Sequence, residues 1–357
     1  MPVFLAENLI PFCSQIFQAV GATEPYAQCI AESLVTSNLV GVDSHGIIRI
    51  PQYLKDIEKG QLNPKAEPTI VVDKGVISVI DGKGGFGQVA ASYAMKISIQ
   101  KCKDHGVGIA GLRRSNHIGR LGEHLSAAVK YGFLAVGTCN GGGPNVAPYG
   151  SSQRVFGTNP IACAVPVRHG WPVLVDFAVG AAAEGKVRVA KNRGDQIDPG
   201  ILINNVGESS TDPNDFYRGG AILPIGGHKG SALSLMIEML SGILTGAGCS
   251  AFPDYDGGNG CFFLVLDPGC FRDGTDFLND VERMQQKVKK AKPAKGFDEV
   301  LLPGESEFRN AQHRKKNGIP VDDETWNQLS GIAKWLDVSQ PTPIGVPRES
   351  LDLVATI

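Results

Sequence analysis

Residues 76–95 have the sequence VISVIDGKGGFGQVAASYAM, and the use of their glycines decides the fold class. Gly82, Gly84 and Gly87 match the G-x-G-x-x-G spacing with which Rossmann folds seat a pyrophosphate on a helix N-terminus. That fingerprint also needs an acidic residue at the carboxyl end of the next strand. Asp104 has about the right spacing, but it precedes the next strand-like run, GVGIAGL, instead of following it. We therefore interpret the glycines as a tight turn between packed elements and expect a fold that is not Rossmann.

Short β-type runs dominate the chain after Pro68. They are TIVVD, VISVID, GVGIAGL, FLAVGTCN, IACAVPV and VLVDFAV, each bounded by Gly, Pro or Asn. Helical patterns are expected at 5–39 (two in succession), 47–53, 88–102, 122–130, 231–244, 277–290 and in the tail TWNQLSGIAKWLDV. The fold class is therefore α/β or α+β. We predict a helical domain over residues 1–74, completed by 311–357, and a body over 75–310.

Composition excludes several classes of protein. With 357 residues the chain is long enough for more than one core. Its 34 Lys and Arg offset 36 Asp and Glu, so the basic surface that nucleic-acid binding needs is missing. The longest apolar stretch, 230–248, carries Glu238 in its middle, where a charge is costly in lipid, so we expect a buried helix and no membrane partner. No secretory signal pattern and no CxxC pair is visible, which favours a reduced, cytoplasmic protein.

The segment Asp43-Ser44-His45-Gly46-Ile47-Ile48-Arg49 contains the first candidate site. If residues 45–49 are helical, His45 and Arg49 are i and i+4 and lie about 6 Å apart on one face. That spacing suits a 2-oxo acid, because a guanidinium binds the carboxylate in a bidentate manner while an imidazole donates to the carbonyl oxygen. A helix-start histidine bonded to backbone, with a solvated surface arginine, explains this segment equally well.

Three further segments combine polar side chains with glycines. Ser115 to Arg120 follows a strand, where α/β proteins assemble sites, but His117 and His124 have no third ligand at suitable spacing, so no metal is expected. Glycines and asparagines cluster at 140–145 and 157–160, where they could let a flat ligand approach the backbone. The preference of these residue types for turns also explains both clusters. The stretch GGHKG at 226–230 precedes an apolar helix, so its glycines and lysine could bind a phosphate at the helix N-terminus. A surface lysine near a helix cap explains the same stretch equally well.

Together these segments resemble the malate/L-lactate dehydrogenase-like oxidoreductases, a family unrelated to Rossmann-fold lactate dehydrogenases. The matching stretches, in family order, are GVDSHGIIR, GFGQVAASYAM, SNHIGRLGEH, VAPYG, GTNPIACAVP, LVDFA, EGKVRVA, YRGGAILPIGGHKG, LTGAG, LLPGESE and NGIPVDDETW. HIGRLGEH, EGKVRVA and YRGGAILPIGGHKG look closest to the hydroxycarboxylate dehydrogenase B branch. The resemblance implies a non-Rossmann nicotinamide-binding body with a mostly antiparallel or mixed sheet, a small helical domain, and usually a homodimer.

The resemblance also implies roles for individual residues. His45 would be the proton donor beside the nicotinamide, Arg49 would hold the substrate carboxylate, and His117 would line the site. The implied cofactor contacts are His45, Gly119, Arg120, Leu121, Asp176, Phe177, Ala178, Val179, Gly180, His228, Lys229, Asn259, Pro303, Gly304, Glu305 and Ser306. The cofactor would be NAD or NADP, with NAD favoured. The substrate would be a small anionic 2-oxo or 2-hydroxy acid.

Some positions depart from the family pattern. Val179-Gly180 stands where relatives usually have Thr-Ser, Ser231 replaces an aromatic residue after GHKG, and Asn204 stands where Asp is frequent. We predict reversible hydride transfer between a nicotinamide and a 2-oxo or 2-hydroxy acid. The same carboxylate clamp would serve a reductase of cyclic imine acids such as Δ1-pyrroline- or Δ1-piperideine-2-carboxylate, and the sequence does not separate the two. A nucleotide-sensing binding protein without turnover is the alternative from another class.

Overall fold

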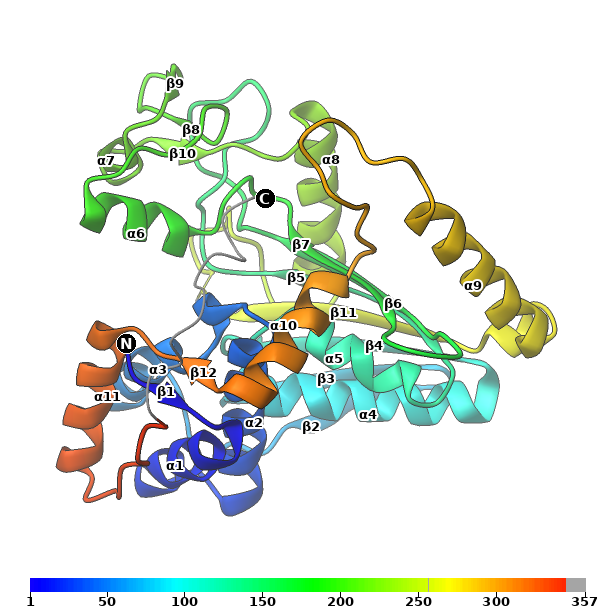
Figure 1. The fold of residues 1–357 in the computed structure, drawn as a ribbon, viewed down its shortest axis with the longest axis horizontal. Coiled ribbons are helices and arrows are strands. Elements are labelled where there is room, and N and C mark those ends of the chain that lie inside the picture. Colours follow the sequence, from blue (N-terminus) through cyan, green and yellow to red (C-terminus); the bar gives the residue numbers. More distant parts are fainter. Residues whose placement is uncertain (256, 345–357) are drawn as a thin grey trace. The chain divides into compact units, whose positions relative to one another are not determined.

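The computed structural model describes residues 1–255 and 257–344 (Figure 1). The chain divides into two compact units. The first contains Met1–Lys65 and the chain from Ser306 onward, and the second contains Ala66–Glu305. These boundaries lie upstream of the positions 74/75 and 310/311 expected from sequence. The first boundary lies before residue 69 because the strand at 69–74 pairs within the second unit.

The first unit is mainly helical. Its elements are β1 (Val3–Phe4), α1 (Ala6–Ala19), α2 (Glu24–Leu39), the 3-10 turns η1 (Asp43–His45) and η2 (Ile47–Arg49), α3 (Ile50–Glu58), α10 (Glu305–Asn317), β12 (Ile319–Pro320) and α11 (Asp323–Trp335). Strand β12 pairs antiparallel with β1, and the ring of Trp326 lies 4.2 Å from that of Phe4. The C-terminal segment therefore packs on the N-terminal helices within this unit.

The second unit is built on a seven-stranded mixed sheet in the order β2-β3-β4-β11-β5-β6-β7. Its strands are β2 (Thr69–Lys74), β3 (Ile77–Gly85), β4 (Val107–Ser115), β5 (Leu134–Asn140), β6 (Pro160–Val165), β7 (Val173–Ala178) and β11 (Asn259–Leu266). The pair β3–β4 is parallel, and the other neighbours in this sheet are antiparallel. A Rossmann sheet is parallel, so the expectation of a non-Rossmann α/β body is confirmed.

Helices and a small sheet complete the second unit. They are α4 (Gly87–His105), α5 (Leu121–Val129), α6 (Glu184–Arg193), α7 (Pro213–Tyr217), α8 (His228–Ile237), the π-helix η3 (Glu238–Ile243), the 3-10 turn η4 (Pro268–Cys270), α9 (Gly274–Lys289), and the strands β8 (Leu202–Ile203), β9 (Ser209–Ser210) and β10 (Ala221–Ile222). The three short strands form a sheet in the order β10-β8-β9.

Strand β11 at the centre of the large sheet was missed by the sequence prediction. It pairs with β4 on one side and with β5 on the other, and its buried positions alternate along most of its length. The signal was present, because the apolar run CFFLVL is bounded by Gly and Asn before it and by Asp-Pro-Gly after it. A short apolar run of this kind also suits a buried helix. Only its length and the turn residues on either side distinguish a strand from a helix.

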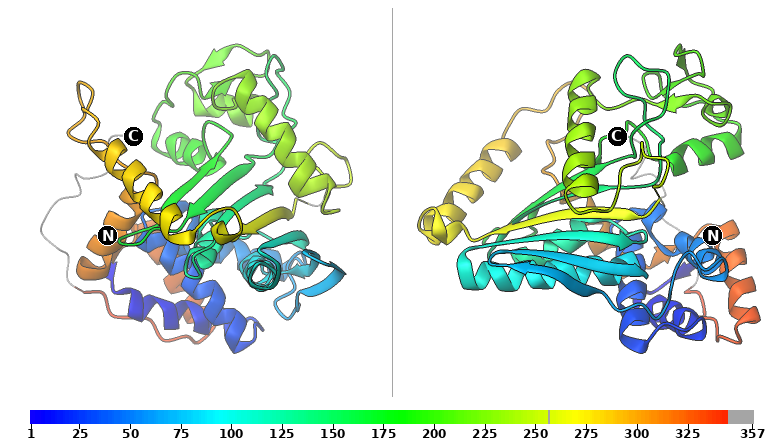
Figure 2. Two further views of the ribbon diagram at one scale, coloured as in Figure 1. Left: turned by 90° about the vertical axis from the view of Figure 1, so that its right-hand side faces the viewer. Right: turned by 180° about the vertical axis from the view of Figure 1, so that it is seen from behind.

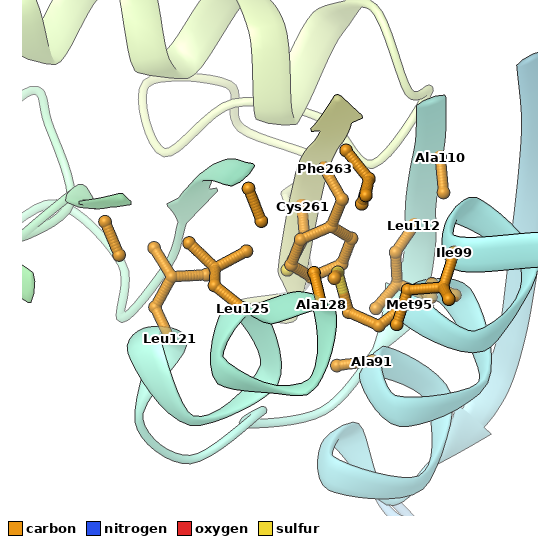
Figure 3. Close-up of a cluster of buried hydrophobic side chains, with 14 of the residues drawn as sticks. Ala91, Met95, Ile99, Ala110, Leu112, Leu121, Leu125, Ala128, Cys261 and Phe263 are labelled. Atoms are coloured by element: carbon orange, nitrogen blue, oxygen red, sulfur yellow. The ribbon is translucent and has the colours of Figure 1, made fainter. Parts of the chain in front are cut away.

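The main core of the second unit lies between the sheet and helices α4 and α5 (Figure 3). Ala91, Met95 and Ile99 repeat every four residues, so they form one face of α4. They pack with Leu112 and Phe263 of the sheet, and Phe263 is completely buried. This apolar layer fixes the helix that begins at Gly87 and the loop that precedes α5.

Helix α8 and η3 lie on the opposite face of this sheet (Figure 2). On β4, Gly111 faces Thr245 after η3, whereas its neighbour Leu112 belongs to the α4 core. We expected 230–248 to be a buried helix, and this prediction is wrong for its outer side: Met239 is 50% and Ile243 54% exposed. Among the described residues, no helix is long and apolar enough to cross a membrane.

Candidate active site

The His45 segment is two 3-10 turns and not one helix. Turn η1 ends at His45, Gly46 is extended with φ −88° and ψ −155°, and η2 ends at Arg49. The expectation that residues 45–49 form a continuous helical face is therefore wrong. Gly46 breaks the helix because a Cβ there would lie 2.2 Å from Oδ1 of Asn38, so only glycine fits against that side chain.

Buried Asn38 and the charged residue Arg314 hold this segment in place. Oδ1 of Asn38 accepts from the backbone N–H of Ile47 at 2.9 Å, and its Nδ2 donates to Oδ1 of Asp43 at 2.6 Å. The guanidinium of Arg314 donates to both Asp43 oxygens, at 2.7 and 3.1 Å. A bidentate pair of this kind fixes direction as well as distance.

Ser44 touches both of the predicted catalytic side chains in this unit. Its Oγ lies 3.0 Å from Nδ1 of His45, and its carbonyl oxygen accepts from Nε of Arg49 at 2.7 Å. Arg49 also donates to Oε1 of Gln52 at 2.8 Å. The imidazole and the guanidinium, both half-buried, are thus oriented by one residue although no helix joins them.

The glycine motif at 82–87 packs against the loop that carries His117. A Cβ on Gly87 would lie 2.2 Å from the carbonyl oxygen of Asn116 and 2.3 Å from that of His117. Nδ2 of Asn116 donates to the carbonyl of Gly84 at 2.9 Å. Carbonyl oxygens therefore lie against the first residue of α4, where a Rossmann fold would place a pyrophosphate. The glycines are therefore packed against other backbone, as expected. The expected tight turn is wrong in form, because Gly82–Gly85 belong to strand β3, where Lys83 and Gly84 have positive φ and the register with β4 shifts.

Asn259 connects the His117 loop to the glycine-rich run that begins at Asn140. Its Oδ1 accepts from the backbone N–H of Ile118 at 3.0 Å, and its Nδ2 donates to the carbonyl of Asn140 at 3.2 Å. Oδ1 of Asn140 in turn accepts from the N–H of Gly260 at 3.0 Å. Asn259 is buried, and its side-chain hydrogen bonds connect its own strand to the loop at Ile118 and to Asn140.

The residues before α5 carry an unsatisfied cationic donor. Arg120 is 8% exposed, and its Nε has no hydrogen-bond partner among the described residues. Asp176 on β7 accepts from the N–H of Gly122 at 2.8 Å, so its charge lies at the positive end of α5. A buried N–H without a partner costs free energy, which an anionic ligand would recover.

Residues 176–180 are tied to the segment that leads to α8. The backbone N–H groups of Val179 and Gly180 donate to the carbonyl of Thr158 at 3.0 and 3.1 Å, and the N–H of Ile225 donates to the carbonyl of Val179 at 2.8 Å. Helix α8 then begins at His228, with no side-chain cap and no acidic residue in its first turn.

Tyr149 is a neighbour of this helix start that the sequence did not assign to the site. Its ring lies 5.8 Å from that of His228, and it is 66% exposed. Its backbone N–H donates to Oγ of Ser231 at 3.0 Å. The hydroxyl of Ser231, one of the departures from the family pattern, therefore holds an aromatic residue beside His228. Tyr149 lies in the stretch VAPYG, and nothing in that stretch predicts the contact with His228.

The remaining predicted contacts lie near β7. The N–H of Leu174 donates to the carbonyl of Pro303 at 3.2 Å, and a Cβ on Gly304 would lie 3.0 Å from Cβ of Leu174. Glu305, 1% exposed, pairs with Lys289 at 2.9 Å. These residues therefore belong to the same unit as Asp176.

The structure sorts the predicted residues into two sets. The first unit holds His45, Arg49 and Ser306, and the second holds His117, Gly119, Arg120, Leu121, Asp176, Phe177, Ala178, Val179, Gly180, His228, Lys229, Asn259, Pro303, Gly304 and Glu305. His124, weighed as a metal ligand, instead bonds the carbonyl of Ile118 through Nε2 at 2.8 Å. No cluster of three His, Cys, Asp or Glu suited to a metal occurs in the described part of the chain.

Comparison with known proteins identifies the family. The family model described as malate/L-lactate dehydrogenase matches residues 4–330. The chain belongs to the malate/L-lactate dehydrogenase family. A malate dehydrogenase of Pyrococcus horikoshii is 34% identical over 343 residues, 93% of this chain and 95% of that protein. Hydroxycarboxylate dehydrogenase B of Escherichia coli is 34% identical over 357 residues, 98% and 96% of the two chains.

A solved structure extends the similarity. The Δ1-piperideine-2-carboxylate reductase of Pseudomonas syringae matches with a TM-score of 0.84 and 30% identity, over 93% of this chain and all of that one. The resemblance drawn from the sequence to malate/L-lactate dehydrogenases is therefore confirmed, and the chain is a dehydrogenase of this family.

The close packing at Gly87 gives a first prediction. Gly87→Ala should lower the free energy of unfolding by about 1–3 kcal/mol, because the added methyl must displace two carbonyl groups. Gly185→Ala is the matched control, since a Cβ at that position in α6 meets nothing within 4 Å. Urea denaturation measures both. Equal stability of the two variants would contradict the contact between Gly87 and the His117 loop.

Proposed function

We propose that this dehydrogenase interconverts a 2-oxo acid and a 2-hydroxy acid by hydride transfer with a nicotinamide cofactor. The observation that carries the proposal is the His45–Ser44–Arg49 arrangement, in which one residue orients both an imidazole and a guanidinium. A 2-oxo acid presents a carboxylate beside a carbonyl, which are the two groups that these side chains recognise.

The second unit fits a dinucleotide at two places. Helix α8 begins at His228 without a side-chain cap, and the exposed Lys229 lies in its first turn, so a phosphate would meet a positive helix end and a cation. Arg120 offers a buried N–H donor that lacks a partner among the described residues. The residues that would hold the cofactor are Gly119 to Leu121, Asp176 to Gly180, His228, Lys229, Asn259 and Pro303 to Ser306, with His45 beside the nicotinamide.

The nicotinamide, when bound, supplies or accepts the hydride at its C4 atom. We favour NAD over NADP, and the choice is for experiment to decide, because Val179 and Gly180 provide neither an acid for a ribose 2′-hydroxyl nor a cation for a 2′-phosphate. His117 would line the site, and Asn259 would keep its loop in position through the N–H of Ile118.

Proton transfer belongs to His45 in this proposal. Its imidazole gives a proton to the substrate carbonyl oxygen in reduction and takes it from the hydroxyl in oxidation. Ser44 Oγ at Nδ1 fixes the orientation of the ring. Arg49, oriented by the Ser44 carbonyl and Gln52, holds the substrate carboxylate through its charge.

Reduction of a cyclic imine acid is the second candidate. The similarity to Δ1-piperideine-2-carboxylate reductase favours it, and Arg49 would serve an imine acid as well as an oxo acid. A nucleotide-sensing protein without turnover would bind NADH but oxidise it with neither class of substrate.

The apolar outer face of α8 and η3 supports a homodimer. Leu235, Met239, Ile243 and Leu244 are 46, 50, 54 and 64% exposed and follow one another along this element. Contiguous apolar surface of this kind usually marks an interface. We propose that a second copy of the chain covers this face and that the dimer works in the cytoplasm, where the eight cysteines, none of which forms a disulfide in the described part of the chain, remain reduced.

The roles of His45 and Arg49 are separable by kinetics. His45→Ala should lower turnover about 10²–10⁴-fold because the proton donor is lost, with the Kd of NADH little changed. Arg49→Lys should mainly raise the KM of the acid, because lysine lacks the planar fork. Absorbance at the nicotinamide band, with 2-oxo acids and cyclic imine acids each offered with NADH and NADPH, measures both. Normal turnover in His45→Ala would exclude the assigned role.

The dimer face gives another prediction. Ile243→Lys should convert a dimer to a monomer in light scattering after gel filtration, because a charge cannot be buried unpaired in an apolar interface. Phe271→Lys is the control: Phe271 is 75% exposed and lies outside α8 and η3, so its replacement should leave the mass unchanged. A wild-type monomer, or an Ile243→Lys dimer, would contradict the proposed interface.

A further inference from the structure

Glu238 is a buried carboxylate to which neither the sequence nor the proposed function gives a role. It opens the π-helix η3 on the face of the sheet opposite α4, and it is 4% exposed. No ion pair to Glu238 is present among the described residues. A carboxylate in such surroundings persists only when hydrogen bonds replace the lost water.

The bonds to Glu238 come from N–H donors on three separate segments. Oε1 accepts from the backbone N–H of Gly157 at 3.1 Å and from Nδ2 of Asn159 at 3.0 Å. Oε2 accepts from Nδ2 of Asn140 at 3.3 Å and from the backbone N–H of Ser250 at 3.2 Å. Both oxygens act only as acceptors, so the charged form of the carboxylate is the one that matches these partners.

Three of these four donors, on Asn140, Gly157 and Asn159, belong to or adjoin residues that are hydrogen-bonded to a segment proposed to bind the cofactor. Thr158, between two of the donors, accepts from the N–H groups of Val179 and Gly180. Asn140 accepts from Nδ2 of Asn259, which holds the N–H of Ile118 beside His117. Through Val179, the chain of bonds reaches Ile225 and the approach to α8.

Glycines allow the segments to come this close. A Cβ on Gly157 would lie 2.4 Å from the carbonyl of Gly141, and one on Gly242 would lie 2.8 Å from Nδ2 of Asn140. A Cβ on Gly260 would lie 2.1 Å from the carbonyl of Ser241. This close approach places Asn140 and Gly157 within hydrogen-bond distance of the Glu238 carboxylate.

We propose that Glu238 is a positioning residue that, through Asn140 and the segment 157–159, sets the proposed cofactor-binding residues 178–180 and Asn259 in their binding geometry. This inference rests on the proposed function, because the segments it organises are those assigned to the nicotinamide cofactor. Glu238 touches neither reacting atom. It acts by fixing Asn140, Gly157 and Asn159, and through them the loop at Val179.

Glu238→Gln is the direct test, since it preserves the shape of the side chain. The amide replaces an acceptor oxygen with an N–H₂ group, which would face either the Gly157 and Asn159 donors or the Asn140 and Ser250 donors. The Kd of NADH, measured by fluorescence titration of the full chain, should rise at least tenfold. The KM of NADH should rise with it, while kcat at saturating cofactor changes less.

A second readout needs no cofactor. Hydrogen exchange of the unliganded protein should show lost protection of the Val179 and Gly180 amides in Glu238→Gln. Thr245→Val is the matched control, because it removes a buried hydrogen bond of 2.6 Å to the Ser241 carbonyl just after η3 without touching the donors of Glu238. We expect it to lower the Tm but to leave the Kd of NADH and the exchange at Val179 unchanged.

A third variant covers the case in which Glu238→Gln fails to fold. Asn159→Gly deletes one donor and suits the backbone, since Asn159 has φ +47°. It should also raise the Kd of NADH and expose the Val179 amide. Wild-type Kd and exchange in Glu238→Gln or in folded Asn159→Gly, or equal effects in Thr245→Val, would overturn the proposal. Failure of the wild-type chain to bind NADH or NADPH would instead contradict the proposed function, and hydrogen exchange would still test Glu238.

Discussion

The buried carboxylate of Glu238 is a single group to which three separate segments of the second unit are hydrogen-bonded. Removing a charge from water costs several kcal/mol, and here no cation offsets that cost within the described residues. The compensation comes from N–H donors of segments that are far apart in sequence. Losing one donor would leave the carboxylate partly unsatisfied, so the segments hold one geometry together. The proposed cofactor loops are attached to the same donors, and this gives a binding surface that exists before any ligand arrives.

The high glycine content has a matching explanation. The chain has 45 glycines in 357 residues, and the motif at 82–87 invites their assignment to a phosphate loop. In the structure that motif is filled by the carbonyl groups of Asn116 and His117. Glycines serve instead where backbone meets a side chain or another backbone at a distance too short for a Cβ, as at Gly46 against Asn38 and at Gly242 against Asn140. Glycine is therefore required at Gly46 and Gly242 by the close approach of other segments of the chain.

Sequence patterns predicted the fold class and six of the strands in the large sheet, because these runs carry β-branched residues between turn signals. They missed β11, a short apolar run without alternation in its letters. The helix predicted over residues 45–49 is wrong, since Gly46 lies against Asn38 and local helix propensity does not contain that contact. For Glu238 the sequence predicted only that its charge argues against a membrane-spanning helix. Its partners Gly157 and Asn159 lie 81 and 79 residues away in sequence. No local pattern encodes such pairs, nor the contact of Tyr149 with His228.

The proposed reaction is direct hydride transfer between a nicotinamide cofactor and C2 of the acid, with His45 as the proposed acid–base group and Arg49 as the proposed carboxylate ligand. The most direct measurement is the fate of deuterium from NADH labelled stereospecifically at C4, reacted with a 2-oxo acid and followed by NMR and mass spectrometry of the product. We expect deuterium at C2 of the 2-hydroxy acid, from one face of the nicotinamide only. A product that carries solvent hydrogen at C2, or no product from any 2-oxo or cyclic imine acid, would contradict it.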